Sequence, residues 1–281
     1  MNWDSPEMEA LVDEALAEDI GPGDLTSETL IPISRSISAV FLAKESGTLA
    51  GLPLVCKIFR RLDPRCHVKE LIVDGGAVKR GFEICRLKGK ARALLAGERL
   101  VLNFLQRLSG IATETARYVR KAQRFGIAVL DTRKTTPMLR SLEKYAVAMG
   151  GGRNHRAGLY DAILVKDNHL KLQPDFRSIL ESFGARGYAA DQVEVEVTTL
   201  NMLRRASGAG VRRFLLDNMA PSVIRRCVRR KQPEMYFEVS GGINSSNFSR
   251  YLIRGVDAIS IGALTHSVRS LDISMEIIES D

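Results

Sequence analysis

The fold is decided by residues 131–170, which read DTRKTTPMLRSLEKYAVAMGGGRNHRAGLYDAILVKDNHL. Two short apolar runs frame this segment, GIAVLD at 126–131 and DAILVK at 161–166, and each has the length of a buried strand. Each run ends in a polar segment, TRKTT after the first and the charged turn KDNH after the second. Two such strands with one helix-length segment between them predict a βα unit.

A helix is predicted between the two strands. Pro137 opens it, because proline is favoured in the first helical turn, and Thr135 or Thr136 is the expected cap. Four apolar residues recur at intervals of three or four and predict the buried face: Leu139, Leu142, Ala146 and Met149. The glycines at 150–152 are expected to end this helix.

Five cations of this segment lie where a regular element ends: Arg133, Lys134, His155, Arg156 and Lys166. No helix face or turn requires a cation at these positions. Cations at strand ends, beside a helix N-terminus that itself attracts anions, indicate a pocket for a small ligand with several negative charges. The competing interpretation is that His155 has a purely structural role and that its hydrogen bonds only stabilise the fold.

From residue 126 onward, apolar strands alternate with helical segments at intervals of roughly 20 to 35 residues, the spacing of repeated βα units. In an α/β barrel all strand ends converge on one mouth, where active sites lie, whereas an open sheet brings fewer of them together. We therefore expect an incomplete barrel, because only six or seven strands are visible. The expected strand ends are Asp131, Lys166, Glu196, Asp217, Ser240 and Gly262.

The chain before residue 126 predicts a different domain. Residues 8–16 form one face of an acidic, amphipathic helix, and residues 19–32 form a loop in which turn chemistry explains Asp24 and Thr26. Short β-rich runs from 36 to 90 predict an antiparallel sheet with flanking helices.

The two domains are expected to be joined by a long helix over 97–123 that breaks near Ser109 and Gly110. We therefore predict an N-terminal α/β sandwich domain over residues 1–108 and the barrel over 109–267. The C-terminal segment, 264–281, reads as a last helix and a strand, and residues 268–281 are expected to return to the first domain.

Composition places the chain among ordinary globular proteins, with 281 residues, 45% hydrophobic and 26% charged. No apolar run approaches the length of a membrane span, and the acidic start argues against a signal or transit peptide. The four cysteines show no CxxC spacing, so a zinc site is not expected, and they suit the reduced thiols of a cytoplasmic protein.

A net charge of +8 permits a nucleic-acid partner. Against that reading, only 6% of the residues are aromatic, no nucleic-acid-binding signature is present, and the basic tract at 225–231 has the spacing of a solvated helix face. We expect neither nucleic acid nor membrane as a partner, because a basic balance serves small acidic substrates equally well.

Two carboxylates at neighbouring strand ends, Glu196 and Asp217, are natural ligands for Mg²⁺ or for sugar hydroxyls. Glu194 shares a strand face with Glu196, but Glu196 is the stronger candidate because it lies nearer the strand end.

Small residues close the last two strands, as SGGI at 240–243 and IGALTHS at 261–267. Their backbone N–H groups could cradle a phosphate, as loops after late barrel strands commonly do. His266 could bind that phosphate or cap a helix, and His169 could orient the KDNH turn. Arg107, on the long helix, reads from the sequence alone as a surface arginine.

Taken in order, these motifs resemble the quinolinate phosphoribosyltransferase family. The resemblance covers nearly the whole chain and includes ALAEDIGPGDLTS, NFLQRLSGIAT, LDTRKTTP, EKYAV, GGGRNHRAGLYDAILVKDNH, VEVEV, LLDN, SGGI and DAISIGALTHS. It implies a type II phosphoribosyltransferase fold that works as a homodimer, with an active site at the barrel mouth closed by the partner subunit's N-terminal domain. It further implies Mg²⁺-dependent transfer of phosphoribosyl from phosphoribosyl pyrophosphate to quinolinate, with decarboxylation, in NAD biosynthesis.

The resemblance also assigns roles by position. Arg133, His155, Arg156 and Lys166 match the groups that bind the quinolinate carboxylates, and Arg107 matches an arginine lent by the neighbouring subunit. Lys134, Glu196 and Asp217 match groups that handle the phosphoribosyl pyrophosphate and its Mg²⁺. The phosphate-binding loops correspond to Ser240, Gly241, Gly242, Gly262 and His266. Lys134, Lys166, Glu196 and Asp217 are the expected catalytic residues.

Two positions depart from the family pattern. Met138 stands where the family usually has glycine, and Val239 where a smaller residue commonly precedes SGG. Both departures bear on local loop shape. Two rival functions stay open at this point, a related phosphoribosyltransferase with a different acceptor and an RNA-binding or metabolite-sensing module on an inactive barrel.

Overall fold

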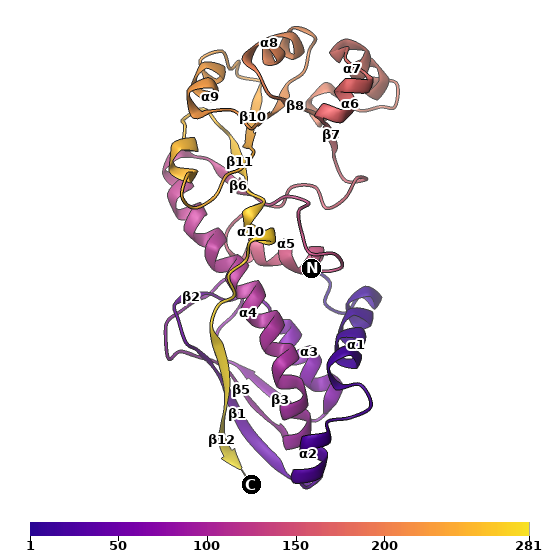
Figure 1. Ribbon diagram of the computed structural model, residues 1–281, viewed down its shortest axis with the longest axis vertical. Helices are drawn as coiled ribbons and strands as arrows, with labels where there is room; N and C mark the ends of the chain where they lie inside the picture. The colour runs from indigo at the N-terminus through magenta and orange to yellow at the C-terminus, as the bar shows by residue number, and fades with distance from the viewer. Residues whose placement is uncertain (281) are drawn as a thin grey trace. The chain divides into compact units, whose positions relative to one another are not determined.

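The computed structural model describes residues 1–280, which form two compact units. The N-terminal unit comprises Met1–Glu114, Ser141–Gly151 and the C-terminal segment from Val268, and the barrel unit comprises Thr115–Arg140 and Gly152–Ser267. Helix α4 (Ala91–Ala122) contributes residues to both units (Figure 1). These units group residues by their proximity in space and do not define domain boundaries along the sequence. The boundary predicted after residue 108 therefore stays a prediction.

The N-terminal unit is built on an antiparallel sheet with the strand order β12-β1-β5-β3. The C-terminal strand lies beside β1, with Ala43 opposite Ile273, so the end of the chain returns to this unit (Figure 1). The bounds are β1 (Ser36–Ala43), β3 (His67–Glu70), β5 (Glu83–Lys90) and β12 (Ile273–Ser280), with a separate pair β2 (Gly47–Thr48) and β4 (Ala77–Val78).

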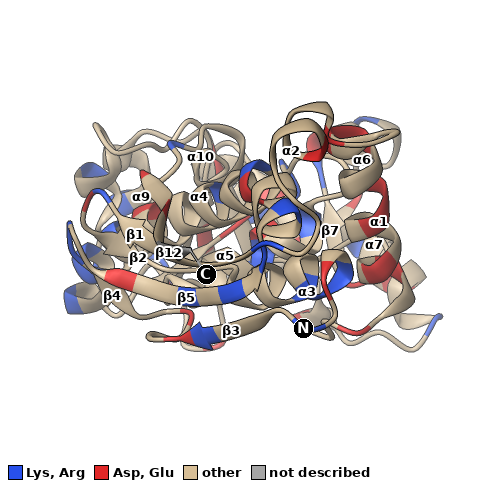
Figure 2. Cartoon of the chain, turned by 90° about the horizontal axis from the view of Figure 1, so that it is seen from below, with Lys and Arg blue, Asp and Glu red and all other residues tan. Residues whose placement is uncertain are grey.

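Helices α1 (Pro6–Ile20) and α3 (Leu52–Leu62) belong to this unit and are both amphipathic. Met8, Val12 and Leu16 form the buried stripe of α1, and its acidic side stands out in red in Figure 2. That side faces cations of α3, where Arg61 Nε donates to Asp13 Oδ1 at 2.7 Å. The predicted opening helix is therefore present and extends in both directions.

The predicted loop at 19–32 is only partly a loop, because it contains α2 (Leu25–Leu30). Oδ1 of Asp24 accepts hydrogen bonds from the backbone N–H groups of Thr26 and Ser27, at 3.1 and 3.0 Å. A side-chain oxygen in that position satisfies the free amides of a first helical turn. Asp24 is thus the N-cap of α2, and this structural role accounts for an aspartate at that position.

The predicted break in α4 is wrong, since the helix runs without interruption through Ser109 and Gly110. A Cβ on Gly110 would lie 2.3 Å from the backbone oxygen of Arg269, so glycine is required for the C-terminal segment to pass this closely. Ser109 is fully buried, and its hydroxyl accepts from the Ala50 amide at 3.1 Å. The Ser–Gly pair serves close packing inside the N-terminal unit.

The barrel unit contains six parallel strands in the order β6-β11-β10-β9-β8-β7. Strands β6 and β7 stand at the two edges of the described sheet, so the barrel is incomplete, as predicted. The strands are β6 (Ala128–Leu130), β7 (Ile163–Val165), β8 (Val193–Val197), β9 (Arg213–Asp217), β10 (Tyr236–Ser240) and β11 (Ala258–Ser260). The helices are α6 (Asp167–Leu172), α7 (Phe176–Gly184), α8 (Leu200–Gly208), α9 (Pro221–Val228) and α10 (Ala263–His266).

Two local predictions in the deciding segment are corrected. Helix α5 (Arg140–Met149) begins three residues after Pro137, because Met138 adopts a left-handed backbone with φ of 66° that cannot continue a helix. The sequence KDNH is the start of α6, with Lys166 as its N-cap. His169 does orient this start, since its Nδ1 accepts from the Lys166 amide at 2.9 Å.

Within residues 1–280, no helix combines the length and the apolar character needed to cross a membrane.

Candidate active site

The inner face of the six-stranded sheet is unusually polar. Glu194 and Glu196 share one face of β8, and the pairing of Glu194 with Arg213 and of Ser240 with Asp217 puts those residues on the same face of β9 and β10. Asp217 and Ser240 pair at the ends of β9 and β10. Glu196 and Glu238 lie one step deeper, each opposite Leu215, and Glu194 pairs with Arg213 one step below them.

At the strand ends, the loop after β6 meets the loop after β11. Thr265 Oγ1 donates to the backbone oxygen of Lys134 at 2.8 Å. A Cβ on Gly262 would lie 3.1 Å from both the Lys134 side chain and the His266 ring, so these two side chains gather over the glycine backbone. The structure therefore brings together Lys134, Gly262 and His266, three residues that the sequence predicted for phosphate binding.

The loop after β10 is shaped by close packing against the loop after β9. Gly241 and Gly242 both have positive φ, 100° and 59°. A Cβ on Gly241 would lie 2.5 Å from the backbone nitrogen of Asn218, and that nitrogen donates to the Ser240 oxygen at 3.0 Å. Only glycine fits such a position, so the SGG sequence is a geometric requirement of this loop.

The two carboxylates predicted to handle Mg²⁺ lie near each other. Burial and the neighbouring charges of Asp217 and Asp167 raise the pKa of Glu196, while Lys166 and the amide of Asp167 act in the opposite direction. A carboxylate whose ionisation is opposed by burial and by a neighbouring carboxylate fits a divalent cation site, because the cation would offset both effects. Lys166 is exposed beside them.

Arg133 and Arg156 form a like-charged pair. Burial and the charge of Arg133 lower the pKa of Arg156, which is only 8% exposed. Nη1 of Arg156 donates to the Ala162 oxygen at 3.1 Å, and Nε of Arg133 is buried without a hydrogen-bond partner among the described residues. Two guanidinium groups held together in low dielectric favour an anionic ligand.

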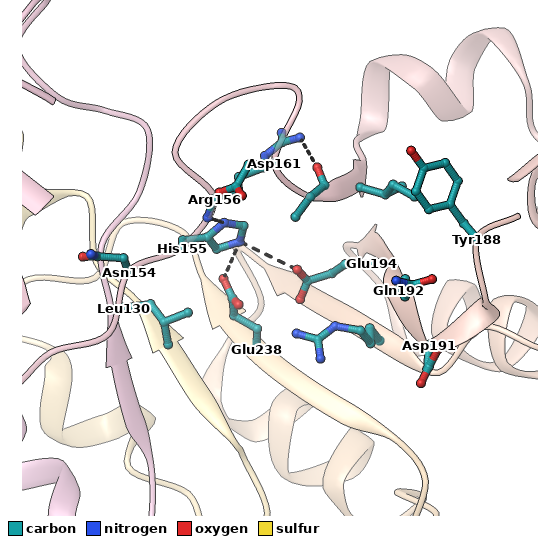
Figure 3. Close-up of a pocket in the computed structure, with 13 residues that line it drawn as sticks. Leu130, Asn154, His155, Arg156, Asp161, Tyr188, Asp191, Gln192, Glu194 and Glu238 are labelled. Carbon is teal, nitrogen blue, oxygen red and sulfur yellow. Dashed lines mark hydrogen bonds and ion pairs between the residues drawn. The ribbon is translucent and has the colours of Figure 1, made fainter. Parts of the chain in front are cut away.

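The His155 ring points toward Glu194 and Glu238 (Figure 3). Its Nε2 is 3.4 Å from Glu238 Oε1 and 3.7 Å from Glu194 Oε2, and its Nδ1 accepts from the Arg156 amide at 2.7 Å. These groups line a cavity of about 420 Å³ that also borders Arg213. Glu238 was not predicted as a site residue, although a glutamate in the apolar run YFEVS was a signal for it.

Arg107 lies in the N-terminal unit, on α4. Its side chain is 32% exposed and is paired with Glu143 of α5, which is fully buried. The predicted site residues of the barrel unit therefore gather at the ends of its strands, and Arg107 is the one predicted residue that belongs to the other unit.

The four cysteines are free thiols. Burial raises the pKa of Cys66 to about 11 and that of Cys56 to about 12, the latter helped by Glu70. Such thiols are poor nucleophiles at neutral pH.

Comparison with known proteins identifies the family. Residues 24–109 match the model for the quinolinate phosphoribosyl transferase N-terminal domain, and residues 111–276 match that for its C-terminal domain. The chain belongs to the quinolinate phosphoribosyltransferase family. The resemblance stated from the motifs is thereby confirmed over nearly the whole sequence.

Individual members of this family are similar along their full length. The chain is 43% identical to a probable nicotinate-nucleotide pyrophosphorylase [carboxylating] of Bacillus subtilis, over 96% of this chain and 93% of that protein. Its structure matches the crystal structure of NadC from Streptococcus pyogenes with a TM-score of 0.91 and 37% identity, covering 97% and 98% of the two chains. The nicotinate-nucleotide pyrophosphorylase of Francisella tularensis matches with a TM-score of 0.90 and 35% identity, covering 98% of each chain. The predicted fold, a type II phosphoribosyltransferase, is therefore confirmed.

Proposed function

We propose that this protein transfers the phosphoribosyl group of phosphoribosyl pyrophosphate to quinolinate and decarboxylates the product. The products are nicotinate mononucleotide, pyrophosphate and CO₂, as required for NAD biosynthesis. The observation that carries this proposal is the pairing of half-buried Arg133 with buried Arg156, which suits a dianionic acceptor, in a chain whose relatives bear the name of this activity.

The acceptor site is assigned to the cations of the deciding segment. Arg133 and Arg156 would bind the two carboxylates of quinolinate through charge-assisted hydrogen bonds, with Lys166 at the edge of the site. His155 belongs to the same group by position. Arg107 would come from the partner subunit of a homodimer, because it lies in the N-terminal unit and its family counterpart is lent in this way.

The donor site is assigned to the loops that follow β6, β10 and β11. Lys134 and His266, gathered over Gly262, would bind phosphate oxygens, and the backbone amides after Ser240 would cradle the 5′-phosphate. Glu196 and Asp217 would hold the ribose hydroxyls.

The same two carboxylates would hold Mg²⁺. When bound, this ion neutralises charge on the pyrophosphate leaving group. The repulsion that raises the pKa of Glu196 supports this assignment, since a cation between the carboxylates would remove it.

The residues support the following sequence of events. As the bond from the ribose carbon to pyrophosphate breaks, that carbon gains positive charge, and Lys134 stabilises the departing anion. The pyridine nitrogen of quinolinate then bonds to the ribose carbon and becomes cationic. The bond to the adjacent carboxylate breaks, CO₂ leaves, and its electron pair stays on the cationic ring, where the carbon takes up a proton.

A cytoplasmic location is inferred as well, because four free thiols persist best in a reducing compartment. No nucleic-acid partner is required, since the cations discussed above are assigned to small anions.

The test is direct turnover. Purified protein is mixed with quinolinate, phosphoribosyl pyrophosphate and Mg²⁺, and nicotinate mononucleotide and CO₂ are followed. Product from quinolinate supports the proposal. Turnover with nicotinate in place of quinolinate would instead identify a related transferase with a different acceptor, and no turnover of any pyridine acid would favour the non-catalytic alternative.

A further inference from the structure

We propose that Glu194 and Glu238 are positioning residues for the acceptor substrate, which hold the His155 ring so that it fixes the backbone of Arg156. This inference rests on the proposed function, in which Arg156 binds a quinolinate carboxylate. It assigns a purpose to two buried carboxylates of the barrel sheet that the proposed chemistry does not use.

The hydrogen bonds of His155 define its protonation. The Arg156 amide donates to Nδ1 at 2.7 Å, and a ring nitrogen that accepts a hydrogen bond carries no proton. The proton of the neutral ring therefore lies on Nε2. That nitrogen lies 3.4 Å from Glu238 Oε1, within hydrogen-bond range, and 3.7 Å from Glu194 Oε2, whose charge attracts it without a direct hydrogen bond (Figure 3).

The same arrangement argues against a metal ion between these three residues. Their ligand atoms all lie within 4.8 Å of one another, which is close enough for one cation. A metal-bound imidazole, however, normally donates a hydrogen bond from its other ring nitrogen. Here that nitrogen is the acceptor of the Arg156 amide. The ring orientation thus favours a hydrogen-bond network.

The network fixes the two peptides on either side of His155. The His155 amide donates to Oδ1 of the fully buried Asp131 at 2.8 Å, and the Arg156 amide donates to the His155 ring. If the ring turned away, the Arg156 amide would lose its acceptor in a region with little solvent. The carboxylates therefore act on Arg156 through the ring.

Arg156 needs such support because its neighbourhood opposes it. Burial and then the charge of Arg133 lower the pKa of Arg156 and act against its charged form, whereas the charge of Glu194 favours that form. An arginine whose charged form is disfavoured in this way would turn its guanidinium toward solvent unless its backbone and its guanidinium were both held in place. The bond from its Nη1 to the Ala162 oxygen holds the head group, and the His155 network holds the backbone.

One of the two carboxylates receives a further hydrogen bond. Ser260 donates through its hydroxyl to Glu238 Oε1. Oε1 of Glu194 is buried without a hydrogen-bond partner among the described residues, and Glu194 lines the cavity of about 420 Å³ together with Arg213, Tyr188 and Gln192. A polar cavity of this size has room for the water that would satisfy that oxygen.

The decisive experiment compares Glu238→Leu with Glu238→Gln. Leucine removes the acceptor for Nε2–H, whereas glutamine keeps a side-chain oxygen there. We expect Glu238→Leu to raise the KM for quinolinate by about tenfold or more, with the KM for phosphoribosyl pyrophosphate within about twofold of wild type. Glu238→Gln should recover most of that loss. An unchanged quinolinate KM in Glu238→Leu, or an equal rise in both KM values, overturns the inference.

A matched control and a second readout keep the outcome interpretable. Leu215 pairs with Glu238 across the sheet and is equally buried, so Leu215→Ala perturbs the same level without touching the network. It should lower the thermal midpoint and leave both KM values near wild type. If Glu238→Leu does not fold, ¹⁵N NMR of the wild type decides, with the His155 signals assigned from a His155→Gln spectrum. A protonated Nδ1 in the neutral ring overturns the inference.

Failure of the inference and failure of the proposed function are distinguishable. If wild-type protein does not convert quinolinate, the proposed function is wrong. If it does convert quinolinate and Glu238→Leu behaves like wild type, the positioning role alone is wrong.

Discussion

Arg107 donates from both Nε and Nη2 to one oxygen of Glu143, Oε1, at 3.0 and 2.6 Å. Glu143 is fully buried, while a third of the Arg107 side chain is exposed. The buried carboxylate anchors the guanidinium of a side chain that is itself partly exposed. The pair therefore presents Arg107 at the surface of the N-terminal unit, as an arginine lent to a partner subunit would require.

Replacing Glu143 with glutamine should weaken both stability and acceptor binding. The neutral amide holds Arg107 less firmly and leaves part of a buried network unmatched, so we expect a loss of about 1–3 kcal/mol in unfolding free energy. Chemical denaturation measures that loss, and the quinolinate KM should rise in parallel. If Glu143→Gln lowers stability but leaves the quinolinate KM normal, the role of Arg107 in acceptor binding does not depend on its contact with Glu143.

The two halves of the site should respond separately to mutation. Arg156→Ala removes a charged contact to quinolinate and should raise its KM by about tenfold to a hundredfold. Asp217→Ala should instead raise the KM for phosphoribosyl pyrophosphate. Steady-state kinetics with each substrate varied in turn separates these effects, and equal defects for both substrates in both variants would contradict the division of roles.

Met138 should be a site where glycine stabilises the protein. Its φ of 66° is unfavourable for any residue with a Cβ, and its side chain is 82% exposed, so little packing is lost on its removal. The greater freedom of glycine in the unfolded chain offsets part of the gain. We expect Met138→Gly to raise the unfolding free energy by about 0.5 kcal/mol. Met138→Ala serves as the control and should give no increase.

Sequence patterns predicted the strand ends well, because an apolar run followed by a polar residue marks where a buried strand meets a mouth. They failed where a distant segment decides the outcome. Ser109 and Gly110 look like a helix break until Arg269 is seen to pass against the glycine. Val239, which the motifs flagged, is fully buried and adjoins Glu238 and Ser240 on the opposite sheet face.

The inner glutamates were missed for a related reason. Alternation in YFEVS shows that Glu238 shares a face with Ser240, but it cannot show whether that face meets water or a closed interior. In most sheets a glutamate in such a position faces solvent. Here it is 1% exposed, because the incomplete barrel encloses a polar network around His155.

Activity should depend on divalent cations through Glu196 and Asp217. Treatment with a chelator should abolish turnover, and added Mg²⁺ should restore it. Glu196→Gln removes one of two expected ligand charges, so the Mg²⁺ concentration for half-maximal activity should rise by about tenfold. Leu215 pairs with Glu196 on the neighbouring strand and lies on the same sheet face. Leu215→Ala should keep the wild-type Mg²⁺ requirement. Full activity of wild type in excess chelator would refute the assignment.

Stability should change with pH through Glu238. Burial, followed by the nearby charge of Glu194, raises the pKa of Glu238 to about 7, although His155 and the Ser260 hydroxyl act in the opposite direction. Because the folded pKa lies above the ordinary value of 4.5, the proton on this group stabilises the folded state. That contribution is complete below pH 4.5 and is lost as the pH rises through about 7.

Glu238→Gln should remove this dependence, since its amide does not titrate. We expect the difference in unfolding free energy between Glu238→Gln and wild type to move in favour of the variant between pH 5 and pH 8, by on the order of 1–3 kcal/mol. Urea denaturation at a series of pH values measures it. Glu45→Gln, at a carboxylate of the N-terminal unit that lies beside Arg269, is the control and should show no such trend in this range. A constant difference between Glu238→Gln and wild type across that range would mean that Glu238 is ionised throughout, and that the His155 network carries a full negative charge at neutral pH.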